Sequence, residues 1–118
     1  LILSADCPDL TSPKVLRSTM GGVFRMPIKV VENMEDAIAE LKEQGFAVYA
    51  TALSEKSVSI TELKLDGKCA AVIGNEGNGL TQQVIDACTA PIIIPMAGKA
   101  ESLNAAIAAS IVIWEMCR

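Results

Sequence analysis

The 118-residue sequence contains no histidine. This absence excludes the commonest general base, the commonest zinc ligand and every serine or cysteine mechanism that needs an imidazole partner. The four cysteines form no C-x-x-C pair, so we expect reduced, buried thiols and no metal site. No uncharged stretch reaches the roughly 20 apolar residues of a membrane-spanning helix, and no signal peptide is recognisable. We therefore expect a cytoplasmic protein.

Charge is also scarce, above all toward the end of the chain. The 10 basic and 14 acidic residues give a net charge of -4, and only six of them lie in positions 69–118. An acidic chain is no general binder of phosphates, so nucleic-acid binding would require a local basic patch. The length and the hydrophobic content of 51% suit one compact domain over residues 1–118.

Apolar runs alternate with helical patterns along the chain. Strands are predicted at 1–4, 27–31, 46–51, 69–73 and 91–94, and helices at 14–20, 34–44, 81–88 and 102–117, with Ser12, Asn33 and Ser102 as helix N-caps. This alternation predicts an α/β fold with a mostly parallel sheet and helices on both faces. The last helix is apolar all round, so we expect it to pack on its own sheet and on a second subunit, or to be fully buried within one chain.

Two segments that follow predicted strands combine glycines with polar side chains, at the place where open α/β sheets bind ligands. In 74–80 the glycine spacing matches neither G-x-G-x-x-G nor a P-loop. This segment is either a glycine-rich turn or a loop whose backbone approaches a ligand, with Glu76 accepting hydrogen bonds or binding a cation. In 94–104, Ser102 is a candidate cap, and Asn104 serves either the backbone or a substrate.

Taken together, the two segments resemble a known family. The strings V-I-G-N-E-G-N-G-L at 72–80 and I-I-I-P-M-A-G-K-A-E-S-L-N-A-A-I-A-A-S-I at 92–111 are similar to motifs 2 and 3 of the SpoU family, the TrmH-like RNA ribose 2'-O-methyltransferases. Residues 14–27 resemble the piece that precedes the family's middle strand. The resemblance covers essentially the whole chain.

The resemblance implies a SPOUT fold with a C-terminal trefoil knot, S-adenosylmethionine as the cofactor, RNA (rRNA or tRNA) as the substrate and a homodimer formed through the knot. It implies catalytic or active-site roles for Glu76, Ser102 and Asn104. Arg17 and Arg25 are the remaining cations near the site, and as guanidinium groups they suit RNA backbone phosphates better than proton removal. The resemblance places the cofactor-binding residues at Gly74, Ile94, Leu103, Thr51, Ala52, Leu53, Asn75, Gly77 and Met96.

The family's motif 1, an Asn-x-Gly segment followed by an arginine, belongs upstream of the strand that ends at Ser4. We therefore interpret the chain as an N-terminally truncated methyltransferase domain and expect it alone to bind the cofactor weakly or not at all and to turn over poorly, because that arginine is the proposed activator of the 2'-hydroxyl. Two alternatives remain open at this point. One is a non-catalytic dimerisation or cofactor-binding module, and the other is a Rossmann-type nucleotide binder with Glu76 on a ribose.

Overall fold

The computed structural model describes residues 1–75, 77–99 and 102–118 and forms two compact units, Leu1–Ala37 and Ile38–Arg118. Each unit has a parallel sheet of its own, β1-β2 in the first and β4-β6-β3-β5 in the second. The strands are therefore parallel, as predicted, but their backbone hydrogen bonds divide them between two sheets. Within the described ranges, no helix has the length and apolar character needed to cross a membrane.

The first unit is built around a capped helix. Ser12 precedes α1, and its hydroxyl accepts a hydrogen bond from Val15 N at 3.3 Å, as the Ser-Pro signal predicts. The helix ends at a turn in which Met20 and Gly21 both have positive φ. The described elements of this unit are β1 (Ile2–Ser4), α1 (Pro13–Ser18), the 3-10 turn η1 (Gly22–Phe24) and β2 (Lys29–Val31).

Helix α2 (Met34–Glu43) runs across the boundary between the two units. The side-chain oxygen of Asn33 accepts from Asp36 N at 2.9 Å, so the predicted cap is confirmed. At the other end, Lys42 Nζ donates to Ala87 O at 3.1 Å and Lys68 Nζ donates to Gln44 O at 3.1 Å. These two lysines therefore hold the end of the helix to neighbouring segments of the second unit.

The second unit contains the larger sheet. Its central strand, β3, pairs with β5 on one side and with β6 on the other, and β4 pairs with the outer edge of β6. Pro91 lies in β6 without breaking the sheet, because the pairing of β6 with β4 begins only at Ile92. The described elements are β3 (Ala47–Thr51), β4 (Val58–Ser59), the 3-10 turn η2 (Ile60–Glu62), β5 (Cys69–Val72), α3 (Gln82–Ala87), β6 (Ala90–Ile93) and α4 (Ala105–Cys117).

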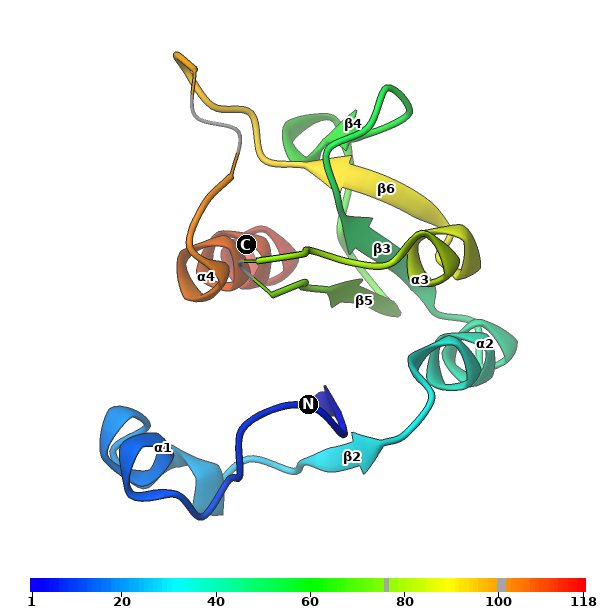
Figure 1. Cartoon of the computed structure of the whole chain (residues 1–118). Helices are drawn as coiled ribbons and strands as arrows, with labels where there is room; N and C mark the ends of the chain where they lie inside the picture. Colours follow the sequence, from blue (N-terminus) through cyan, green and yellow to red (C-terminus); the bar gives the residue numbers. More distant parts are fainter. Residues whose placement is uncertain (76, 100–101) are drawn as a thin grey trace. The chain divides into compact units, whose positions relative to one another are not determined.

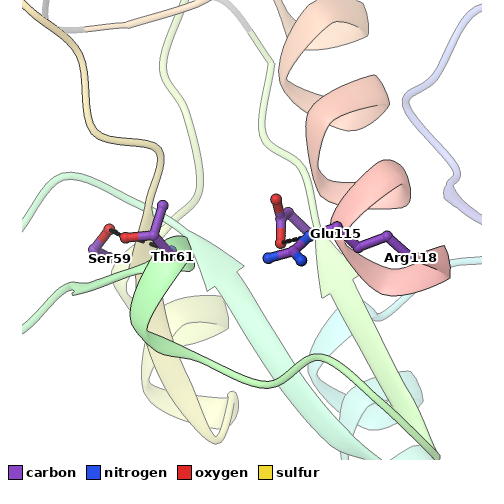
Figure 2. A network of polar contacts seen from close by, with 4 residues as sticks. All are labelled: Ser59, Thr61, Glu115 and Arg118. Atoms are coloured by element: carbon purple, nitrogen blue, oxygen red, sulfur yellow. Dashed lines mark hydrogen bonds and ion pairs between the residues drawn. The ribbon is translucent and has the colours of Figure 1, made fainter.

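Alternate residues of β3 supply the two sides of this core. Tyr49 packs in a cluster with buried Ile60 and with Val112 and Met116 of α4. Its neighbours Val48 and Ala50 are fully buried and point to the opposite face, since successive side chains of a strand alternate. Helix α3, which Thr81 caps, contacts β6 and buries Val84. Figure 2 shows two smaller contacts, the Ser59–Thr61 pair that begins η2 and the Glu115–Arg118 ion pair that ends α4.

Two predictions about local structure are wrong, and one open alternative is decided. Helix α4 begins at Ala105 rather than at Ser102, because Asn104 supplies the cap: its Oδ1 accepts from Ala106 N at 2.9 Å and from Ile107 N at 3.3 Å. Of the two arrangements left open for α4, full burial within one chain is not observed, since Ile107, Ile113 and Trp114 are exposed. The buried-thiol interpretation fails for Cys7 and Cys117, which are exposed free thiols, whereas Cys88 is buried.

Candidate functional site

One cavity of about 340 Å³ lies in the second unit at the carboxyl ends of β3, β5 and β6. This is the edge at which parallel α/β sheets bind ligands, because the loops there diverge from neighbouring strands. In Figure 1 the loop after β5 and the segment after β6 leave the sheet on the side at which α4 lies. The described lining is Thr51, Ala52, Leu53, Ile73, Gly74, Asn75, Asn78, Gly79, Leu80, Ile85, Ile92, Ile93, Ile94, Met96, Ser102, Leu103, Ala105 and Ala108.

The structure therefore brings together most of the residues to which the sequence assigns a site. Eight of the nine predicted cofactor-binding residues line the cavity, and so does Ser102. Gly77 lies in the same loop as Asn75 but is not part of the described lining. Glu76 is outside the described residues. The role of each of these residues in binding or catalysis stays a prediction.

The side chain of Asn75 stabilises the turn that follows β5. Asn75 Oδ1 accepts hydrogen bonds from Gly77 N at 3.0 Å and from Asn78 N at 2.7 Å, and Asn75 O accepts one from Gly79 N at 3.0 Å. An asparagine that bonds to the amides of the following residues stabilises a tight turn. Asn75 thus shapes the rim of the cavity through its own loop.

Gly74 is required by the same loop. A Cβ atom at this position would lie 2.6 Å from Gly79 C and 2.8 Å from Leu80 N, both of them backbone atoms. The absent side chain therefore allows the two ends of the loop to touch each other, in agreement with the glycine-rich turn that was one of the two alternatives left open by the sequence. Gly79, at φ +63, occupies the left-handed region that favours glycine.

Thr51 closes the sheet beneath the cavity. Its hydroxyl donates to Val72 O at 2.9 Å, which ties the end of β3 to the end of β5. The next residue, Ala52, donates its N–H to Ile92 O at 3.1 Å, and Ser57 Oγ donates to Ala52 O at 2.6 Å. The three strand ends are therefore linked to one another directly under the lining residues.

The described lining has no ionisable side chain. Its polar groups are hydroxyls, side-chain amides and main-chain N–H and C=O groups, and the rest is aliphatic. No described cluster of three or more histidine, cysteine or acidic residues could hold a metal ion. Such a cavity suits an organic ligand with an apolar body that is oriented by a few hydrogen bonds.

Sequence reasoning missed several lining residues. Ile92 and Ile93 belong to β6, Ile73 directly follows β5, and Ile85 comes from α3. Asn78, Gly79 and Leu80 complete the loop after β5, and Ala105 and Ala108 belong to the first turn of α4. An aliphatic residue near a strand end looks the same in sequence whether it lines a cavity or fills the core, so no residue-level signal marked the isoleucines.

The fold and the cavity together define a ligand-binding α/β domain of the parallel-sheet class. The chain belongs to the SpoU rRNA Methylase family, whose model matches residues 1–114. This match replaces the interpretation as an ordinary Rossmann-type nucleotide binder. It confirms the resemblance that the two loop motifs suggested.

Similar proteins point the same way. The chain is 34% identical over 116 residues to an uncharacterised tRNA/rRNA methyltransferase from Synechocystis sp., covering 98% of this chain and 42% of that protein. It is similar in structure to an AdoMet-bound rRNA methyltransferase from Sinorhizobium meliloti, with a TM-score of 0.88, 37% identity and coverage of 98% and 44%. A solved RNA 2'-O ribose methyltransferase matches with a TM-score of 0.82, 27% identity and coverage of 98% and 44%. The chain thus spans less than half the length of these relatives.

The fold prediction is confirmed as a parallel-sheet α/β fold that matches SpoU methyltransferase structures. The trefoil knot that the resemblance implies stays a prediction. The one-domain organisation over residues 1–118 also stays a prediction.

Proposed function

We propose that the cavity binds S-adenosylmethionine and that the protein transfers the methyl group of this cofactor to a ribose 2'-hydroxyl of rRNA or tRNA. The supporting observation is that both family motifs, which residues 81–91 separate along the chain, line one cavity at the carboxyl ends of three parallel strands. Membership of the SpoU family supplies the reaction class. The AdoMet-bound relative and the 2'-O ribose methyltransferase named above favour this cofactor and this acceptor.

The cavity fits the cofactor in size and in chemistry. A volume of about 340 Å³ lies within the usual range of ligand pockets, roughly 300 to 1,000 Å³. Aliphatic lining such as Leu53 and Ile73 suits the faces of a purine, and main-chain groups near Gly74, Ile94 and Leu103 can satisfy its edge. We assign Thr51, Ala52, Asn75, Gly77 and Met96 to the surrounding wall and loop.

When bound, S-adenosylmethionine supplies an electrophilic methyl group on a sulfonium centre. The chain's task is to orient this centre and to exclude water, since displacement requires an in-line approach of the ribose oxygen. Ser102 lies at the cavity with its side chain exposed and is assigned to orient the ribose. Asn104 holds the start of α4 beside Ser102, and Glu76 is assigned to the same region on sequence grounds alone.

Activation of the 2'-hydroxyl requires a further group. A ribose hydroxyl is a weak acid, and the described lining offers no residue that could accept its proton or stabilise the oxyanion by charge. We therefore propose that the group that activates the hydroxyl lies outside the described lining of this cavity.

RNA and a second copy of the chain are the proposed partners, in a cytoplasmic enzyme. Arg17 and Arg25 are assigned to RNA phosphates, since guanidinium groups bind phosphate oxygens through paired N–H donors. The exposed apolar face of α4, with Ile107, Ile113 and Trp114, is assigned to the homodimer interface.

A methyl-transfer assay tests this function. The full-length protein is incubated with S-adenosylmethionine carrying a tritiated methyl group and with bulk tRNA or rRNA, and the RNA is then digested to nucleosides. Label in 2'-O-methylnucleosides supports the proposal, whereas label confined to bases or absent from RNA contradicts it. The uncharged lining also favours a second candidate, a non-catalytic cofactor-binding module, which predicts cofactor binding by the full-length protein without label in any RNA.

A further inference from the structure

The distribution of charge in the first unit is unlike that in the rest of the chain. Residues 10–31 hold four of the ten basic residues and none of the fourteen acidic residues. The remaining positions are correspondingly strongly acidic. A basic segment in an acidic chain is the local patch that nucleic-acid binding requires.

Within the described residues, the side chains of Lys14, Arg17 and Arg25 take part in no recorded hydrogen bond or ion pair, and all three residues are exposed. Some cations elsewhere are paired, such as Arg118 with Glu115 and Lys64 with Asp66, whereas the side chains of Lys29 and Lys56 likewise have no recorded partner in the described part of the chain. Three of the unpartnered cations thus lie in one short segment without an acidic residue, residues 14–26, which we call the basic turn.

The basic turn also exposes large apolar side chains. Phe24 is 78% exposed and Met20 is 85% exposed, although the chain has only two phenylalanines. An aromatic ring between cations is the arrangement with which proteins bind unpaired nucleotides, because a base stacks on the ring while the cations contact its phosphates.

The backbone that presents these groups is well ordered by hydrogen bonds. Gly22 N donates to Thr19 O at 2.8 Å, Phe24 N donates to Gly21 O at 3.1 Å and Arg25 N donates to Gly22 O at 3.0 Å. The Arg25 guanidinium lies beside this turn, since a Cβ at Gly21 or at Gly22 would be 3.8 Å from one of its nitrogens. Phe24 and Arg25 are therefore held on one short turn, which reduces the entropy lost on binding.

We propose that the basic turn contacts the RNA substrate and that Phe24 stacks on an unpaired base while Arg17 and Arg25 contact adjacent phosphates. This inference rests on the proposed function, because RNA is the partner of that function. It goes further by adding Phe24 as a base-stacking residue and by specifying the substrate. The bases of a duplex are already stacked, so the RNA must present an unpaired nucleotide here.

Binding of fluorescently labelled RNA to the 118-residue chain tests the proposal. We expect a single-stranded oligonucleotide to bind more tightly than the same sequence in a duplex. Phe24→Ala is expected to weaken binding of the single strand about fivefold or more, whereas Phe24→Trp retains it. Arg17→Ala is expected to lower the slope of log affinity against log salt by about 0.7, and Lys56→Ala, which removes an equal charge elsewhere, is expected to leave both affinity and slope unchanged.

A spectroscopic measurement distinguishes stacking from a merely structural role. The indole introduced by Phe24→Trp, in a chain that also carries Trp114→Phe, is expected to lose fluorescence when the single strand is added. Absence of quenching, or equal affinity of Phe24→Ala and the unchanged chain, overturns the proposal. No binding of the unchanged chain at low salt also overturns it. The proposal is also overturned if the chain forms a dimer that dissociates on Phe24→Ala while RNA affinity is unchanged, because Phe24 would then contact a second copy of the chain and not RNA.

The outcome is separable from that of the proposed function. Quenching and weaker binding without methyl transfer by the full-length protein would support the RNA surface and contradict the enzyme. Methyl transfer at equal rate by the full-length protein and its Phe24→Ala variant, measured below saturating RNA, would support the enzyme and overturn the role of Phe24.

Discussion

Gly74 and Gly79 approach each other so closely that a Cβ atom at Gly74 would lie 2.6 Å from the carbonyl carbon of Gly79. This contact closes the loop after β5, which forms one wall of the cavity. The nearby atoms belong to the backbone and not to a flexible side chain, so no rotamer change can make room for a methyl group.

Gly74→Ala is therefore expected to destabilise the fold by about 2 to 3 kcal/mol and to weaken S-adenosylmethionine binding at least tenfold, because the loop must open. Urea denaturation and calorimetry measure the two effects. Gly67→Ala is the matched control: its φ of +68 imposes backbone strain alone, with no atom within 4 Å of the new methyl group. Equal affinity of the Gly74→Ala variant and the unchanged chain would contradict the role given to this loop.

Asn104 allows its capping role to be separated from its assigned active-site role. Asn104→Ala is expected to cost about 1 kcal/mol of stability, since the amides of Ala106 and Ile107 lose their acceptor. Asn104→Asp restores a capping oxygen and is expected to recover stability. If the amide also orients the ribose, the full-length Asn104→Asp variant stays slow in methyl transfer. Full recovery of turnover would reduce Asn104 to a helix cap.

Trp114 is expected to contribute strongly to self-association. It is 67% exposed on α4 in the single chain, and large aromatic residues dominate the energetics of subunit interfaces. Trp114→Ala is expected to raise the dimer dissociation constant at least tenfold in sedimentation experiments. Val30→Ala, at an exposed apolar position of β2, is expected to leave it unchanged. A chain that sediments as a monomer at tens of micromolar would contradict the homodimer.

Two thiols, the buried Cys88 and the partly buried Cys69, are expected to make stability depend on pH. Burial raises the pKa of Cys88, an effect that the Lys42 cation partly offsets, and burial together with the Asp66 carboxylate raises the pKa of Cys69. At neutral pH both thiols are protonated in the folded and in the unfolded state, so the stability that the protonated thiols contribute is fully present. Above the ordinary thiol pKa the unfolded chain loses its protons first, so stability falls until the pH passes the folded values.

Urea denaturation from pH 7 to pH 10 measures this loss, at most about 1.4 kcal/mol per pH unit for each thiol. Cys88→Ala is expected to reduce the slope, although it lowers stability at every pH by leaving a small cavity. Cys117→Ala, at an exposed position, serves as the control. An unchanged slope in the Cys88→Ala variant would contradict the argument.

Most helix boundaries could be predicted because they depend on residues that are close together in the sequence. The side-chain oxygens of Ser12, Asn33 and Thr81 each accept a hydrogen bond from the amide three residues later, so each cap depends only on a short segment of sequence. The start of α4 could not be predicted in the same way, since Ser102 and Asn104 are equally good caps in isolation. Strand β4, with two residues, has too short a pattern to detect and exists because the edge of β6 is open to it.

Site residues that lie in the recognisable motifs could be predicted, whereas most of the isoleucines that line the cavity were missed. Gly74 and Leu103 lie in recognisable motifs, whereas Ile85 and Ile93 look like any core isoleucine. The division of the strands between two sheets could not be predicted from the sequence either. Every strand has the same apolar pattern, and pairing depends on backbone partners far along the chain.

Calorimetric titration of the 118-residue chain with S-adenosylmethionine tests the central claim most directly, since it concerns the cavity alone and requires neither RNA nor the activating group. Because eight of the nine predicted cofactor-binding residues line the cavity, we expect saturable one-to-one binding by this chain, in place of the weak or absent binding expected from the sequence. Leu103→Arg, which places a long cation in the cavity wall, is expected to abolish this binding while the chain stays folded. Absence of binding at millimolar cofactor, or equal binding by the Leu103→Arg variant, would contradict the assignment of this cavity.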